Sequence, residues 1–123
     1  MTVCFFVSDL HGQTSRYEKL FSAISGERPA AVFLGGDLLP HLFTPLSAFD
    51  GVRRDFINDY LAAGFMKLRE KMRDSYPRIF LILGNDDSRF EEAAILDAAT
   101  RGVWQYIHNR SVHLGGFSVY GYA

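Results

Sequence analysis

Residues 3–12, VCFFVSDLHG, decide how the rest of the chain is interpreted. They open with five apolar residues, a run typical of a strand that is buried on both faces of a parallel sheet. The run stops at Ser8, and a carboxylate (Asp9) and an imidazole (His11) follow directly. In parallel sheets ligands bind beyond the carboxyl ends of the strands. This stretch therefore predicts a strand that delivers reactive side chains to a ligand site.

Two further apolar runs, AVFL at 31–34 and IFLIL at 79–83, predict two more buried strands. Apolar residues at helical spacing precede each of them: Tyr17, Leu20, Phe21 and Ile24 before the second run, and Ile57, Leu61, Phe65, Leu68 and Met72 before the third. The tail predicts short strands and turns. Strands that alternate with helices predict an α/β fold with a mostly parallel sheet.

Capping boxes are expected at the start of two helices, from Ser15 with Glu18 and from Ser88 with Glu91. Cys4, within the first apolar run, is expected in the core.

Polar residues also follow the second and third strands, with GGD at 35–37 and GNDD at 84–87. Taken singly, each motif is more typical of a turn or a helix N-cap than of a metal site. Three of them at successive strand ends favour a divalent-metal site, because carboxylate, imidazole and amide oxygen form a mixed O/N ligand set. Four side chains are expected to converge at this edge of the sheet: Asp9, His11, Asp37 and Asn85.

The series SDLHG, GGDLL and GNDD resembles the D-x-H, G-D and G-N-x-D/E pattern of the calcineurin-like metallophosphoesterase family. The resemblance implies the first half of a four-layer α/β/β/α sandwich. The family's later G-H-x-H motif does not occur in this sequence. We therefore expect residues 1–123 to form one metallophosphoesterase domain that is truncated on its C-terminal side.

The resemblance also implies two divalent ions, of Mn, Fe, Zn, Ni or Co. Asp9 and His11 would hold the first ion, Asp37 would bridge the two, and Asn85 would bind the second. The implied function is hydrolysis of a phosphate monoester or diester by a metal-bound hydroxide. The alternatives are a non-catalytic metal- or phosphate-binding half-domain that lacks the second-half histidines, and an interaction domain whose carboxylates only cap helices.

Three more residues are candidates for the site. Asp86 occupies the position where family members often carry a histidine that protonates the leaving group, so it is the candidate catalytic residue, although a carboxyl group is a poor proton donor at neutral pH. Asp87 is expected to orient a metal ligand without binding the metal itself. His41, in a proline-containing loop, is a candidate for contact with the substrate.

The composition limits the partners. The 123 residues carry a net charge of -1, which gives no signal for nucleic acid, and their apolar runs are too short for a membrane span. One cysteine and no signal peptide predict a cytoplasmic protein. The expected partner is a phosphorylated substrate. Self-association into a homo-oligomer is also expected, because helices at the predicted positions would leave one sheet face uncovered.

Overall fold

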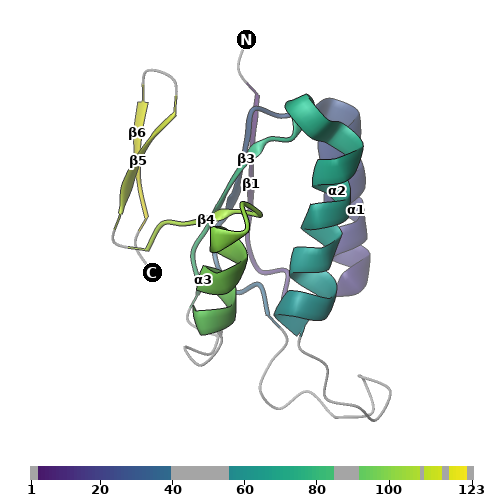
Figure 1. Cartoon of the computed structure of the whole chain (residues 1–123), viewed down its shortest axis with the longest axis horizontal. Helices are drawn as coiled ribbons and strands as arrows, with labels where there is room; N and C mark the ends of the chain where they lie inside the picture. The colour runs from purple at the N-terminus through teal and green to yellow at the C-terminus, as the bar shows by residue number, and fades with distance from the viewer. Residues whose placement is uncertain (1–2, 40–55, 85–91, 109, 115–116, 122–123) are drawn as a thin grey trace.

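The computed structural model describes residues 3–39, 56–84, 92–108, 110–114 and 117–121. The strands and helices alternate as predicted (Figure 1). No helix among the described residues is long and apolar enough to cross a membrane. The elements in chain order are β1 (Cys4–Val7), α1 (Thr14–Glu27), β2 (Ala31–Leu34), the π-helical η2 (Ile57–Ala62), α2 (Ala63–Met72), the 3-10 turn η3 (Arg73–Ser75), β3 (Arg78–Leu81), α3 (Glu92–Thr100), β4 (Gln105–Tyr106), β5 (Ser111–Leu114) and β6 (Phe117–Tyr120).

The main sheet has four strands in the order β1-β2-β3-β4, and every neighbouring pair is parallel. This confirms the predicted α/β fold with a parallel sheet. The register is level across the first three strands, so that Val7, Leu34 and Leu81 lie side by side. The carboxyl ends of these strands therefore meet at one edge of the sheet.

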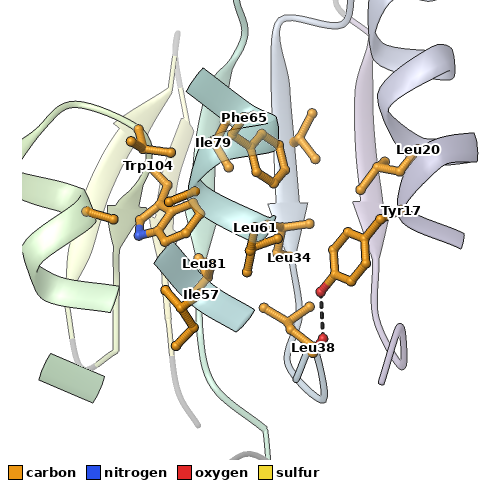
Figure 2. Packing of buried hydrophobic residues seen from close by; sticks show 14 of the residues in the cluster. Tyr17, Leu20, Leu34, Leu38, Ile57, Leu61, Phe65, Ile79, Leu81 and Trp104 are labelled. Carbon is orange, nitrogen blue, oxygen red and sulfur yellow. Dashed lines mark hydrogen bonds between the residues drawn. The ribbon is translucent and has the colours of Figure 1, made fainter. Parts of the chain in front are cut away.

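Helices α1 and α2 cover one face of the sheet, and α3 packs against η2 and β4 (Figure 1). The predicted helical faces are confirmed. Tyr17, Leu20 and Ile24 of α1 are buried, and η2 with α2 buries all five predicted positions. Their side chains meet those of the strands in one core (Figure 2), which also holds Trp104. Because Trp104 Nε1 donates to the carbonyl of Ile95, at 3.0 Å, the indole is buried without losing its hydrogen bond.

The predicted capping box of the first helix is wrong. Helix α1 begins at Thr14, and Gln13 stands at its N-cap without a side-chain hydrogen bond. Ser15 therefore lies inside the helix. The chain enters α1 through a backbone turn in which the amide of Gln13 donates to the carbonyl of Leu10. The second predicted box, at Ser88 and Glu91, lies outside the described residues.

The second face of the sheet is partly covered, which corrects the expectation that it would be open. The antiparallel hairpin of β5 and β6 lies on the side opposite α1 and α2 (Figure 1). It packs with Phe80 and Ile107, which are buried, in a second, smaller cluster. Arg78 links β3 to the hairpin, because its guanidinium donates a hydrogen bond to the carbonyl of His113 in β5.

Strand β1 is not buried on both faces as predicted, and Cys4 is exposed instead of lying in the core. Phe5 and Val7 face the helices, whereas Phe6 on the other face is 75% exposed. The reason is topological. β1 is an edge strand, and the contacts of the hairpin cluster run to β2 and β3 rather than to β1.

Two phenylalanines on this second face are expected to contribute very differently to stability. Phe80 is 1% exposed and stacks on Phe33 with ring centroids 5.2 Å apart. Phe80→Ala should lower the free energy of unfolding by about 3–5 kcal/mol, because it leaves a cavity. Phe6→Ala, the matched control, should change it by roughly 0.5 kcal/mol. Urea unfolding of the three proteins measures both values, and equal losses would contradict the edge position of β1.

Candidate metal centre

The loop that follows β1 is joined by backbone hydrogen bonds to the loop that follows β2. The amide of Asp9 donates to the carbonyl of Gly36 at 3.2 Å. The amide of His11 donates to the carbonyl of Asp37 at 2.9 Å. These bonds continue the pairing of the two strands beyond their last ladder residues. The two loops therefore run side by side, and the side chains that they carry stay together.

Asp9, His11 and Asp37 share an uncommon backbone conformation. Their φ angles are 59°, 47° and 53°, all in the left-handed region. Side chains other than glycine seldom adopt this region, and Asp, Asn and His are the residue types enriched there. Residues held in sparsely populated conformations cluster at functional sites. The three candidate ligands are thus marked by their backbone as well as by their chemistry.

Buried leucines between the polar residues fix both loops to the core. Leu10, between Asp9 and His11, is 5% exposed, and Leu38, directly after Asp37, is fully buried. The hydroxyl of Tyr17 in α1 donates to the carbonyl of Leu38 at 2.6 Å (Figure 2). In each loop the leucines next to the candidate ligands enter the core, while Asp9, His11 and Asp37 stay at least partly exposed.

Two glycines let the ends of β2 and β3 approach closely. Gly36 has a φ of 102°, and a Cβ atom there would lie 2.7 Å from the Cα of Gly84. A Cβ atom on Gly84 would lie 2.8 Å from the Cγ of Asp37. Real Cβ atoms do not approach other atoms so closely. Asp37 therefore occupies space that only a glycine at position 84 leaves open.

The side chains of Asp9, His11 and Asp37 form one group. Each offers a ligand atom, and these atoms all lie within 4.8 Å of one another. His11 Nε2 lies 3.6 Å from Asp9 Oδ1, and Ser8 Oγ donates to Asp9 Oδ2 at 3.0 Å. The side chain of Asp9 is 65% exposed and that of His11 is 22% exposed. The group is thus reachable from solvent at Asp9 and enclosed by protein at His11.

The chemistry of this donor set fits a divalent transition ion. Two carboxylates and one imidazole supply hard oxygen and borderline nitrogen, which suits Mn, Fe, Co, Ni or Zn. Two carboxylates held so close repel each other, and a cation between them would offset that repulsion. Within the described residues this is the group whose His, Cys, Asp or Glu side chains have the spacing of metal ligands.

The remaining sequence candidates, Asn85, Asp86, Asp87 and His41, lie outside the described residues. Sequence reasoning missed two contacts of Asp9. One is the hydrogen bond from Ser8, and the other comes from Arg16 in α1, whose guanidinium donates to the backbone carbonyl of Asp9 at 2.8 Å. No motif signals either contact. Arg16 acts on a carbonyl seven residues away, and only the fold brings the two together.

The fold and the site define a class: an α/β domain with a carboxylate–imidazole group at the carboxyl edge of its parallel sheet. Residues 3–121 match the family described as Calcineurin-like phosphoesterase. The chain therefore belongs to this family, as the resemblance of its motifs implied.

Solved structures share the fold. The crystal structure of TT1561 of Thermus thermophilus has a TM-score of 0.60 and 20% identity, with 94% of this chain and 46% of that chain covered. A second solved structure has a TM-score of 0.60 and 16% identity, with 97% and 51% covered. This chain thus spans about half the length of these structures. No curated protein matches it.

The close approach at Gly84 leads to a prediction with an internal control. Gly84→Ala should destabilise the protein by about 1–3 kcal/mol, because the new methyl group displaces Asp37. Gly26→Ala, in α1, meets nothing within 4 Å. It should stabilise the protein by up to about 1 kcal/mol, because alanine favours a helix more than glycine does. Thermal and urea unfolding measure both, and effects of the same sign would contradict the geometry described here.

Proposed function

We propose that this chain holds a divalent metal ion on Asp9, His11 and Asp37 and contributes it to the hydrolysis of a phosphoester. The observation that carries the proposal is the group of three ligand atoms within 4.8 Å, at the strand ends of a domain that belongs to the calcineurin-like phosphoesterase family. Monoesters and diesters both fit this chemistry.

The described residues have separate tasks in this proposal. His11 supplies a nitrogen and the two aspartates supply oxygens to the ion. Ser8 orients the carboxylate of Asp9 by donating to its Oδ2. The exposed side of Asp9 leaves room for a phosphoryl group to enter from solvent. A divalent ion held by these residues would supply positive charge for the phosphoryl oxygens and would make water a stronger nucleophile.

The other candidate residues complete the proposal. In it Asp37 bridges to a second ion that Asn85 also binds, and Asp87 orients a ligand. Asp86 stands where family members often carry the histidine that protonates the leaving group, and His41 contacts the substrate. The roles of Asn85 and Asp87 are supported by the match of their motif to the family pattern, and that of Asn85 also by the closeness of Gly84, which precedes it, to Asp37. Position 86 departs from the pattern, and His41 is proposed only from its place in the loop that follows Asp37.

A second candidate function is metal or phosphate binding without catalysis. The observation that favours it is that the ligand atoms of Asp9, His11 and Asp37, all within 4.8 Å of one another, suffice to hold one ion. A binding half-domain needs only this group. Hydrolysis through two ions needs the second ion to be held firmly as well.

Metal binding is the first test. We expect Mn²⁺ to bind the wild-type chain in a calorimetric titration. Asp37→Asn removes a charged ligand. It should therefore weaken Mn²⁺ binding by more than the roughly 10–100-fold that is typical for loss of a residue hydrogen-bonded to a metal ligand. Asp74→Asn is the matched control, because Asp74 is an exposed carboxylate in η3, before the start of β3 and away from the site. Equal binding by wild type and Asp37→Asn would refute the assignment.

Hydrolysis is the second test. In the presence of Mn²⁺ the protein should release nitrophenolate from an aryl phosphodiester or monoester, and a chelator should stop the reaction. Asp37→Asn and Asn85→Ala should abolish turnover, whereas Asp86→His should retain or raise it. Metal binding without turnover on either ester would favour the non-catalytic alternative. Loss of activity in Asp86→His, with metal content preserved, would contradict the prediction that a histidine can replace Asp86, and would show that the carboxylate has a specific role.

A further inference from the structure

The backbone of Asp9 is held at both of its polar atoms. Its amide donates to the carbonyl of Gly36, at 3.2 Å. Its carbonyl accepts a hydrogen bond from the guanidinium of Arg16, at 2.8 Å. The bond to Arg16 is the shorter of the two and involves a charged donor. Charge-assisted hydrogen bonds are roughly twice as strong as neutral ones.

Arg16 reaches this carbonyl from a rigid support. It lies in the first turn of α1, directly before Tyr17. Tyr17 is fully buried and hydrogen-bonded to the carbonyl of Leu38, so the helix cannot shift without breaking core contacts. The Asp9 side chain is exposed and its φ of 59° is unfavourable, so this residue depends on its backbone hydrogen bonds to keep its conformation. Helix α1 is thus held in place by the core, and the Arg16 side chain can hold the Asp9 backbone from it.

We infer that Arg16 is a positioning residue of the metal centre, which holds Asp9 in the left-handed conformation that brings its carboxylate to His11 and Asp37. This inference rests on the proposed metal binding. The conformation of the Asp9 backbone decides where its carboxylate lies. Without the guanidinium, the backbone of Asp9 can rotate at φ and ψ toward an ordinary conformation, and Oδ1 then leaves its place 3.6 Å from His11 Nε2. The ion would lose a ligand although every ligand residue is still present.

The charge of Arg16 alone does not explain such a role. A guanidinium near the site repels a cation, so a purely electrostatic contribution would weaken metal binding, and its removal would strengthen it. Positioning predicts the opposite sign. The two accounts therefore separate in one measurement, provided that a second cation on the same helix is removed as a control. Lys19 serves for this, because it is exposed in α1 about one turn beyond Arg16.

The experiment compares Mn²⁺ binding by calorimetry in wild type, Arg16→Met, Arg16→Lys and Lys19→Met. Arg16→Met keeps a long unbranched side chain but has no hydrogen-bond donor. It should bind Mn²⁺ about 10–100-fold more weakly, as expected for loss of a residue that positions a metal ligand. Arg16→Lys keeps one cationic donor and should recover part of the loss. Lys19→Met should bind as the wild type does. The unfolding midpoints of the metal-free proteins should be alike, which a merely structural role of Arg16 would not produce.

Three outcomes would overturn the inference, and they differ. If wild type and Arg16→Met bind Mn²⁺ equally well, or Arg16→Met binds more tightly, Arg16 does not position Asp9, while the proposed metal site stands. If the wild type binds no Mn²⁺, the proposed function fails and the inference with it. A lower unfolding midpoint of metal-free Arg16→Met would also refute the inference, because weaker binding would then follow from a damaged fold.

Discussion

The level register of β1, β2 and β3 is the constraint on which the rest of this molecule depends. Because Val7, Leu34 and Leu81 are direct neighbours, the three chains leave the sheet at the same height. Loops that start level can continue to pair, and Asp9 and His11 do so with the loop after β2. A shift of one residue in either pairing would turn each side chain of that strand to the other face and separate the ligand atoms.

The site combines this regular frame with an irregular backbone. The left-handed conformations of Asp9, His11 and Asp37 cost conformational energy, and hydrogen bonds and buried leucines around them supply the compensation. Tyr17 contributes from the helix side, through its bond to the carbonyl of Leu38. The side chains of Asp9, His11 and Asp37 are therefore held together by the protein itself, which would lower the cost of binding an ion there.

The sequence was sufficient where local pattern and topology agree. The run at 31–34 is strand β2, and the apolar spacing of the helices matches the buried faces. The proximity of Asp9, His11 and Asp37 follows from parallel strand ends. Strand order is not written in any local pattern, so the exposure of Cys4 on an edge strand was missed. The contact between Arg16 and Asp9 was missed for a related reason, since it depends on where the helix lies.

Core leucines lie next to the candidate ligands in both loops, with Leu10 between Asp9 and His11 and Leu38 directly after Asp37. During evolution, Leu10 and Leu38 are therefore constrained both by core packing and by the placement of the adjacent side chains, although neither offers a ligand atom. A smaller side chain at either position would loosen the packing and also let the adjacent ligands move. Stabilising substitutions elsewhere can restore the free energy of unfolding but not the placement of those ligands. Descendants of this chain should therefore vary more freely in the helices than at these two apolar positions.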